Sequence, residues 1–380
     1  MEINNSKLDL SIVIPCLNEA ETIVKCISKC KNKIAKLNIK AEVIVADNGS
    51  TDNSIELAQK AGAKIVKVKK RGYGSALIGG INSAIGKYVI IGDADDSYDF
   101  DKIDEFYNKL LEGYDIVQGC RFPIGGGKIE KSAMPVTHKY IGNPLFSLLS
   151  KLFFSLPFND VYCGYRGFDR NIFLKLDHFS NGMVFAIENL IKFKVYGAKC
   201  AEIPIVLHKD GRKKYKSHLN TISDGWKTLR FLLVTCPRWI YFFPSLLLLI
   251  FSAFNLTEFV FFKDKEDNYL NITNFIQSII YFLLSFQIFM FGLFSSLFAV
   301  KLKFLKSNLI KKFFDIFKLR YAFYISLLGI IIFFIIYIFK ESLQIQTITL
   351  DILKYSITFF SILIILNSLY VSLITLDDKS

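Results

Sequence analysis

The chain has 380 residues, which is enough for one catalytic domain of ordinary size and an additional region. Hydrophobic residues make up 52% of the chain, with 37 Phe, and most of the apolar segments follow Trp239. The part before Trp239 alternates charged and apolar residues, as soluble domains do. The composition excludes a wholly soluble protein and predicts two domains, a soluble one at residues 1–239 and a membrane domain at residues 240–380.

The formal net charge of +13 is compatible with either nucleic acid or an anionic membrane as a partner. Lysine and arginine gather near the apolar segments, where anionic lipids attract cations, and no zinc-finger or RNP-like motif accompanies them. The charge therefore indicates membrane contact and disfavours nucleic acid. Seven cysteines, none in C-x-x-C spacing, are expected to be reduced thiols. The first residues lack the basic and apolar regions of a signal peptide, so the first domain is expected to stay in the cytosol.

In chain order, the first domain alternates expected strands and helices. Short apolar runs bounded by turn residues alternate with segments whose apolar residues have helical spacing. Strands are expected at residues 10–15, 42–46, 64–68, 88–92 and 115–119, and helices at residues 21–37, 53–61 and 74–84. This alternation predicts an α/β fold with a mostly parallel sheet that carries helices on both faces. The glycine triplet at residues 125–127 is expected to form a mobile loop.

Residues 142–158 form an apolar segment with a single charge, Lys151. The segment is too short, and too closely bounded by proline, to predict a membrane span. We interpret it as a helix that lies in the membrane interface; a helix that is buried in the core is equally compatible with the sequence.

Four later segments are long and apolar enough to span a bilayer, which needs about 20 such residues. They are residues 240–262, 275–300, 321–339 and 352–376. The connection between the second and third segments is rich in lysine and holds a single acidic residue, Asp315, which predicts a cytoplasmic position. An even number of spans then leaves the first domain and the C-terminus on the cytoplasmic side as well.

Carboxylate side chains follow the first two predicted strands at their carboxyl ends, where ligands bind in open α/β sheets. Glu19 and Asp47 are expected to face one crevice, where they would accept hydrogen bonds from a base or a ribose. Each of these two segments is also compatible with a helix N-cap.

Four acidic residues follow the strand at residues 88–92, namely Asp93, Asp95, Asp96 and Asp99. Carboxylates this close together repel one another, and a hard divalent cation such as Mg²⁺ or Mn²⁺ that also binds a diphosphate removes the repulsion. The alternative is an acidic cap on the helix expected to begin near Asp101.

Four segments, in this order, resemble the nucleotide-binding core of the family 2 glycosyltransferases of the GT-A fold: SIVIPCLNE, VIVADNGSTDNS, GYGSALIGGINSAIGKYVIIGDADD and DIVQGCRF. Later segments, among them DVYCGYRGFDR, FAIENLI and HKDGRKKYKSHL, resemble the dolichol-phosphate mannose and glucose synthase branch. The resemblance extends from about Leu10 to Trp239. It implies a nucleotide-sugar site formed by Pro15, Asn18, Glu19, Asp47 and Asp93, and a DxD metal site at Asp93 and Asp95.

The same resemblance implies phosphate-binding and catalytic residues. Acceptor-phosphate contacts are implied for Arg121, Arg166, Arg212 and Ser217, while the implied catalytic set is Asp95, Arg121, Glu188 and Arg212. The mannose synthase pattern DADLQ is broken after the DxD motif by Asp96 and Ser97, so the sugar and the nucleotide are not predicted. The absence of a QxxRW motif disfavours a processive polymerase.

These residues predict an inverting transfer of a sugar from a nucleotide-diphosphate sugar to a polyprenyl phosphate, dolichyl or undecaprenyl, at the cytoplasmic membrane face. A phosphate monoester has a second pKa of about 6, so it is mostly a dianion at neutral pH and needs no general base. Histidine is accordingly absent from the acidic and glycine-rich motifs: His138 and His178 lie outside them, and His208 and His218 flank the basic run near Arg212.

Two alternatives remain open at this point. The first is a glycosyltransferase that acts on a hydroxyl group of a glycolipid or polysaccharide and uses Glu188 or Asp160 as its base. The second is a membrane scaffold or flippase-like module whose first domain only binds a nucleotide. That module would need charges along the spans, but only Glu258 and Lys354 interrupt them, both near span ends.

Overall fold

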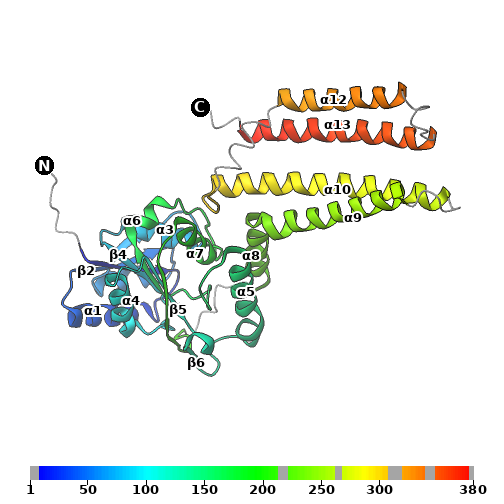
Figure 1. Cartoon of the computed structure of the whole chain (residues 1–380). Coiled ribbons are helices and arrows are strands. Elements are labelled where there is room, and N and C mark those ends of the chain that lie inside the picture. The colour runs from blue at the N-terminus through cyan, green and yellow to red at the C-terminus, as the bar shows by residue number, and fades with distance from the viewer. Residues whose placement is uncertain (1–7, 213–220, 262–267, 307–318, 339–346, 376–380) are drawn as a thin grey trace. The chain divides into compact units, whose positions relative to one another are not determined.

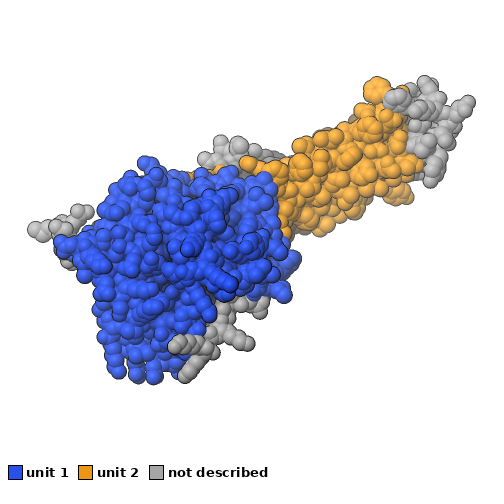
Figure 2. Space-filling model, turned by 90° about the horizontal axis from the view of Figure 1, so that it is seen from below, with its two compact units in different colours: residues 1–232 blue, residues 233–380 orange. Residues whose placement is uncertain are grey.

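The computed structural model describes residues 8–212, 221–261, 268–306, 319–338 and 347–375. The chain divides into two compact units, residues 1–232 and residues 233–380 (Figure 2). The division falls within helix α8, Thr221–Thr235, which is earlier than the boundary predicted at residue 239.

The first unit is built on a seven-stranded sheet of order β3-β2-β1-β4-β7-β5-β8 (Figure 1). Every neighbouring pair is parallel except the two pairs that include β7, so the predicted α/β class with a mostly parallel sheet is confirmed. The strands are β1 Leu10–Cys16, β2 Ala41–Asp47, β3 Lys64–Lys67, β4 Tyr88–Ile91, β5 Ile116–Cys120, β7 Arg166–Asp169 and β8 Cys200–Pro204. The main helices are α1 Ile23–Leu37, α2 Ser54–Lys60, α3 Tyr73–Ser83, α4 Ile103–Leu111, α5 Asn143–Phe154, α6 Arg170–Lys175 and α7 Phe185–Tyr196.

Helices cover both faces of the sheet because both faces of its central strands are apolar. Ile12 and Ile14 of β1 belong to the same buried cluster as Cys26 and Cys30 of α1, so these cysteines are core residues. Val13 points to the other face, where α3 approaches so closely that a Cβ on its Gly80 would lie 2.6 Å from Val13 Cγ1. Near-continuous apolar runs are typical of strands that are buried on both faces.

The glycine triplet at residues 125–127, predicted to be a mobile loop, forms part of a tight connection. A 3-10 turn at Pro123–Gly125 leads into the short strand β6, Lys128–Ile129, which pairs with β9, Val206–Leu207. A Cβ on Gly127 would lie 2.1 Å from the Cys120 carbonyl oxygen, so the turn requires glycine there. The interpretation as a mobile loop is therefore corrected to an ordered turn.

The main helices in the described part of the second unit are α9 Phe243–Phe261, α10 Asn268–Lys301, α12 Leu319–Ile338 and α13 Thr347–Thr375. In the described residues, three helical segments have the length and composition to cross a membrane: Arg238–Phe261, Ile272–Lys301 and Ile352–Tyr370. They coincide with the first, second and fourth predicted spans. The third predicted span coincides with α12, a helix of 20 residues, several of whose side chains lie outside the description.

Polar side chains join the helices of the second unit. Ser245 of α9 and Ser285 of α10 each donate a hydroxyl hydrogen bond to the other's carbonyl oxygen, at 3.0 and 2.8 Å. Further along the same two helices, the hydroxyl of Ser252 in α9 donates to the Ser278 carbonyl oxygen in α10 at 2.8 Å. Such small polar residues let apolar helices approach closely and exchange hydrogen bonds, as they do between membrane helices.

Candidate active site

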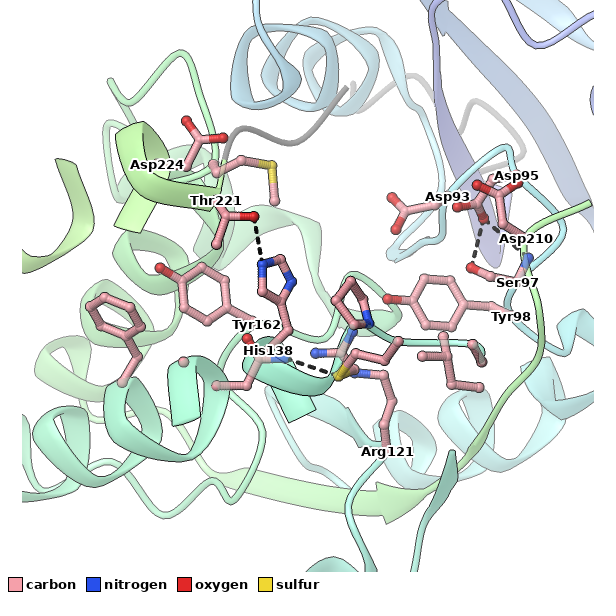
Figure 3. Close-up of a pocket in the computed structure, with 18 of the residues that line it drawn as sticks. Asp93, Asp95, Ser97, Tyr98, Arg121, His138, Tyr162, Asp210, Thr221 and Asp224 are labelled. Carbon is pink, nitrogen blue, oxygen red and sulfur yellow. Dashed lines mark hydrogen bonds between the residues drawn. The ribbon is translucent and has the colours of Figure 1, made fainter. Parts of the chain in front are cut away.

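A cavity of about 400 Å³ lies in the first unit, beside the loop that follows β4 (Figure 3). In this view Asp93, Asp95 and Asp210 lie on one side of it, and His138 and Asp224 lie on the other. We call the first group the acidic end and the second the histidine end. The remaining lining residues include Ser97, Tyr98, Arg121, Met134, Phe146, Tyr162, Met183, Arg212 and Thr221.

The acidic end contains the two carboxylates of the predicted DxD motif. Asp93 accepts a hydrogen bond of 2.9 Å from the Tyr73 hydroxyl, and Asp95 accepts bonds from the backbone N–H and the hydroxyl of Ser97, at 3.1 and 2.6 Å. A Cβ at Gly164 would lie 2.7 Å from Asp93 Oδ2, so glycine leaves room for this carboxylate. Burial, and next the charge of Asp95, raise the pKa of Asp93 to about 7. A cation bound here would relieve both effects.

The other two acidic residues of the run have different partners. Asp96, at a left-handed φ of 61°, is buried and forms ion pairs with Lys25 and Lys29. Asp99 caps the next turn by accepting the Asp101 backbone N–H at 3.0 Å. The cap interpretation therefore applies to Asp99, while metal binding by Asp93 and Asp95 remains a prediction.

Two carboxylates suit a magnesium or manganese ion that keeps water and phosphate oxygens as its other ligands. Across the described ranges, no group of three or more histidine, cysteine, aspartate or glutamate residues is arranged to hold a metal. Metal binding by the two carboxylates Asp93 and Asp95 remains a prediction.

The predicted nucleoside residues surround the loops that follow β1 and β2. Pro15 lies in β1, opposite Ala46 of β2. Asn18 has a left-handed φ of 58° and its side-chain oxygen accepts the Thr51 backbone N–H at 2.8 Å. Asp47 accepts the backbone N–H groups of Gly49 and Ser50, at 3.0 and 3.1 Å. These bonds shape the two loops, and direct contact with a nucleoside remains a prediction.

Arg212, implied as an acceptor-phosphate residue, lies instead among carboxylates. Its Nε donates to Glu19 Oε2 at 2.8 Å, and its Nη2 donates to the other oxygen of Glu19. Its Nη1 lies 2.8 Å from Asp210 Oδ2 and 3.6 Å from Asp95 Oδ2. The Arg212 guanidinium thus contacts both Glu19, which was predicted to bind the nucleotide, and Asp95, which was predicted to bind the metal.

Arg121 lines the cavity and is held by a buried carboxylate. Asp160 accepts from Nε at 2.7 Å, from Nη2 at 2.9 Å and from the Arg121 backbone N–H at 3.1 Å. Within the described part of the chain, Arg121 Nη1 has no hydrogen-bond partner. Because both oxygens of Asp160 are bound to a cation, this carboxylate is not placed to act as a base, contrary to one of the alternatives.

Arg166 and Glu188 are not among the described residues that line the cavity. Arg166 is buried and donates to the Ala186 carbonyl at 2.8 Å and to Asn189 Oδ1 at 3.0 Å. Glu188 accepts the backbone N–H groups of Phe179 and Ser180, at 3.0 and 2.9 Å, and forms an ion pair with Lys192. Both therefore support the fold around the site in this structure, and the phosphate and catalytic roles implied for them have no geometric support. Ser217 lies outside the described residues.

The histidine end contains residues that sequence reasoning did not select. His138, which lies outside the recognised motifs, has its Nε2 2.8 Å from the Thr221 hydroxyl. Tyr162 and Asp224 line the same part of the cavity. No local pattern links His138 with Thr221, because they are 83 positions apart, whereas Tyr162 lies in the segment DVYCGYRGFDR that carries part of the resemblance.

Residues 11–176 match the family model described as glycosyl transferase family 2. The low-salt glycan biosynthesis hexosyltransferase Agl6 of Haloferax volcanii is 33% identical over 237 residues, 62% of this chain and 56% of that protein. Glycosyltransferase AglJ of the same organism is 31% identical, over 56% of this chain and 67% of its own. A Haloferax dolichyl-phosphate hexose transferase is 28% identical, over 52% of this chain and 82% of that protein.

Among solved structures, glucosyl-3-phosphoglycerate synthase from Mycobacterium tuberculosis has a TM-score of 0.46 and 24% sequence identity, over 61% of this chain and 81% of that one. The sheet, the acidic end and these sequence relatives together define a sugar-transferring enzyme with an α/β domain. The chain belongs to glycosyl transferase family 2. It is therefore an enzyme, and the scaffold alternative is wrong.

Proposed function

We propose that the chain transfers a hexose from a nucleoside-diphosphate sugar to the phosphate group of a polyprenyl phosphate at a membrane surface. The observation that carries this proposal is the composition of one cavity. Its acidic end offers Asp93 and Asp95 for a metal-bound diphosphate, and its lining also includes Arg121, whose Nη1 is not used by the described residues.

The donor would bind at the acidic end. Asp93 and Asp95 would hold a Mg²⁺ or Mn²⁺ ion, and such an ion stabilises the negative charge that develops on a departing nucleoside diphosphate. Arg212, which already lies against Glu19 and Asp95, would contribute a second positive charge on the same side. Glu19 and Asp47 would hold the nucleoside, as the family resemblance implies.

The acceptor would reach Arg121 from the other side of the cavity. A guanidinium suits a phosphate group because it presents several N–H donors in one plane. Asp160 fixes two sides of the Arg121 guanidinium, which orients the remaining Nη1. A phosphate dianion needs no base, which agrees with the engagement of Asp160 and Glu188 by cations and backbone N–H groups.

Helix α5 supports the membrane part of the proposal. Its buried residues are Ser147 and Ser150, whereas Leu145, Leu148 and Leu152 are 46%, 62% and 51% exposed. A helix that turns two serines inward and three of its leucines outward is suited to a lipid surface, and this favours the interfacial interpretation over the buried one. The apolar chain of a polyprenyl phosphate would then stay in the lipid. The Haloferax relative named a dolichyl-phosphate hexose transferase supports the same acceptor class.

The test is transfer by the purified full chain from a panel of radiolabelled nucleotide-sugars to either a polyprenyl phosphate or the matching polyprenol. We expect labelled lipid only with the phosphate acceptor and with one class of donor. The Asp95→Ala variant should give none. Label on the polyprenol, or only on a glycan hydroxyl, would overturn the proposal and favour a hydroxyl acceptor.

A further inference from the structure

His138 occupies a place in the cavity that the roles assigned so far do not explain. It is the first residue of a π-helical turn, His138–Gly142, that leads directly into α5. Its Nε2 lies 2.8 Å from the hydroxyl of Thr221, the first residue of α8. The ring therefore connects the segment before α5 with the start of α8, inside the cavity (Figure 3).

The charged and titratable groups around this ring come from three other elements. Arg121 follows β5, Tyr162 precedes β7, and Asp224 lies in the first turn of α8. Lys139, the next residue in the chain, is directed to the Tyr140 ring, with its Nζ 5.3 Å from the ring centroid. Arg121 is thus the neighbouring cation whose charge acts on the imidazole.

Burial, and next the positive charge of Arg121, lower the pKa of His138 below its ordinary value of 6.5. Without acceptor the imidazole is therefore neutral at neutral pH. An anion placed between these two side chains would reverse the electrostatic effect, because it attracts positive charge on both.

We propose that His138 binds the acceptor phosphate together with Arg121, as a specificity-determining residue of the transfer. The assignment rests on the proposed function, since it requires a phosphate acceptor. When the dianion binds, the imidazole takes one proton from solvent and donates an N–H to a phosphate oxygen. The Arg121 Nη1 donates to the same phosphate. In this step one N–H bond forms on the imidazole as one O–H bond of the solvent proton donor breaks, and no other covalent bond changes.

The pH dependence has a definite sign. Phosphate binding raises the pKa of His138, so its contribution to affinity is complete below the pKa of the free enzyme and is lost as the pH rises through the pKa of the complex. Below about pH 6 the phosphate becomes a monoanion and binds less well. The KM for the acceptor should therefore be lowest near neutral or slightly acidic pH and should rise toward pH 8.5.

The experiment measures the acceptor KM, kcat and donor affinity of the full chain between pH 5.5 and 8.5, with a short-chain prenyl phosphate as the probe. His138→Gln should raise the acceptor KM about tenfold at pH 6.5, the size expected for one lost charge-assisted hydrogen bond, and should flatten its rise with pH. Donor affinity should not change. His138→Arg keeps a positive charge at every pH, so its KM should stay low up to pH 8.5.

The matched control is His208→Gln, because His208 is another half-exposed histidine but faces Glu130, with 3.1 Å between Nδ1 and Oε1. It should keep the wild-type pH profile. If the His138→Gln variant labels the phosphate acceptor and its acceptor KM depends on pH as in the wild type, the role of His138 is wrong, while the proposed function stands. A loss of kcat at unchanged KM, with a rate that rises with pH, would make His138 a general base, and its phosphate-binding role would again be wrong. If the wild-type chain labels no phosphate acceptor, the proposed function itself fails.

Discussion

At the scale of single residues, neighbouring carboxylates differ because each has different partners. Asp95 lines the cavity and is oriented by the backbone and hydroxyl of Ser97, whereas Asp96 is neutralised by Lys25 and Lys29. Adjacent positions in the chain therefore differ in their surroundings: Asp95 faces the cavity, and Asp96 is buried in ion pairs with lysines.

This difference gives the first prediction. Asp95→Ala should abolish detectable Mn²⁺ binding and lower transfer by about a hundredfold or more, because only Asp93 would remain as a protein ligand. Asp96→Asn is the matched control: it should retain Mn²⁺ affinity and lower the melting temperature instead, since two lysines lose their charged partner. Calorimetric titration with Mn²⁺ and a thermal melt separate the two effects. Full Mn²⁺ affinity in Asp95→Ala would refute the assignment.

The second prediction concerns Arg212, whose Nη1 lies 3.6 Å from Asp95 Oδ2, so that its guanidinium would compete with a metal ion for this carboxylate. Arg212→Gln should raise the affinity for Mn²⁺ in the absence of nucleotide about two- to fivefold, as expected for a partly solvated charge interaction of up to about 1 kcal/mol. Transfer should fall, because the charge near the leaving group is lost.

Arg170→Gln provides the comparison for this substitution. Arg170 donates to the carbonyl oxygens of Ile81 and Asn82, at 3.4 and 3.5 Å, and is not among the described lining residues. The Arg170→Gln variant should bind Mn²⁺ with the same affinity as the wild type. If Arg212→Gln binds Mn²⁺ no more tightly than Arg170→Gln, the competition between Arg212 and the metal is absent.

At the scale of secondary structure, α5 shows how far hydrophobic content can mislead about burial. Three of its leucines, Leu145, Leu148 and Leu152, are exposed and its serines are buried, and Ser147 uses its hydroxyl to accept the Val161 backbone N–H at 3.3 Å. The inward face thus satisfies a buried backbone group, while the outward face remains apolar.

The third prediction tests the outward face. Leu148→Glu should lower transfer to a long polyprenyl phosphate in vesicles about tenfold, because a charge replaces a leucine at the lipid surface. Transfer to a short, water-soluble prenyl phosphate should be unaffected. Leu111→Glu on α4, where the leucine is 56% exposed, should alter neither rate. Equal rates of Leu148→Glu and wild type with vesicles would show that α5 does not touch lipid.

At the scale of the whole chain, the distribution of charge predicts the orientation in the membrane. The lysine-rich connection at residues 301–320, much of which lies outside the described residues, separates the second and third predicted spans. Cytoplasmic connections carry an excess of lysine and arginine. This charge distribution predicts that the connection, the first domain and the C-terminus lie on the cytoplasmic side.

The fourth prediction is therefore the location of reporter fusions. A reporter after Ser380 or within residues 301–320 should report the cytoplasm, and one within residues 263–268 should report the opposite side. A control fusion at the N-terminus should agree with the C-terminal one. If the two termini report opposite sides, the number of spans is odd and the four-span prediction is wrong.

Local patterns were sufficient to predict much of the fold. The strands β1 to β5 and the helices α1 to α3 follow from apolar periodicity and turn residues, which act over a few positions. The DxD motif was recognisable because Asp93 and Asp95 come directly after β4. Strand β7 was not predicted, because its antiparallel place between β4 and β5 depends on distant partners.

Composition and short motifs by themselves determined that the chain has an α/β domain, apolar helices and an acidic pair at the end of a strand. Only the tertiary structure decided which side chains share a charge or a cavity. Glu19 and Arg212 are 193 positions apart, Arg121 and Asp160 are 39 apart, and His138 and Thr221 are 83 apart. Such pairings depend on how strands and loops meet in space, and a hydrogen bond or ion pair leaves no periodic trace in the sequence. For this reason the sequence indicated the acidic end of the cavity, while the histidine end emerged only from the fold.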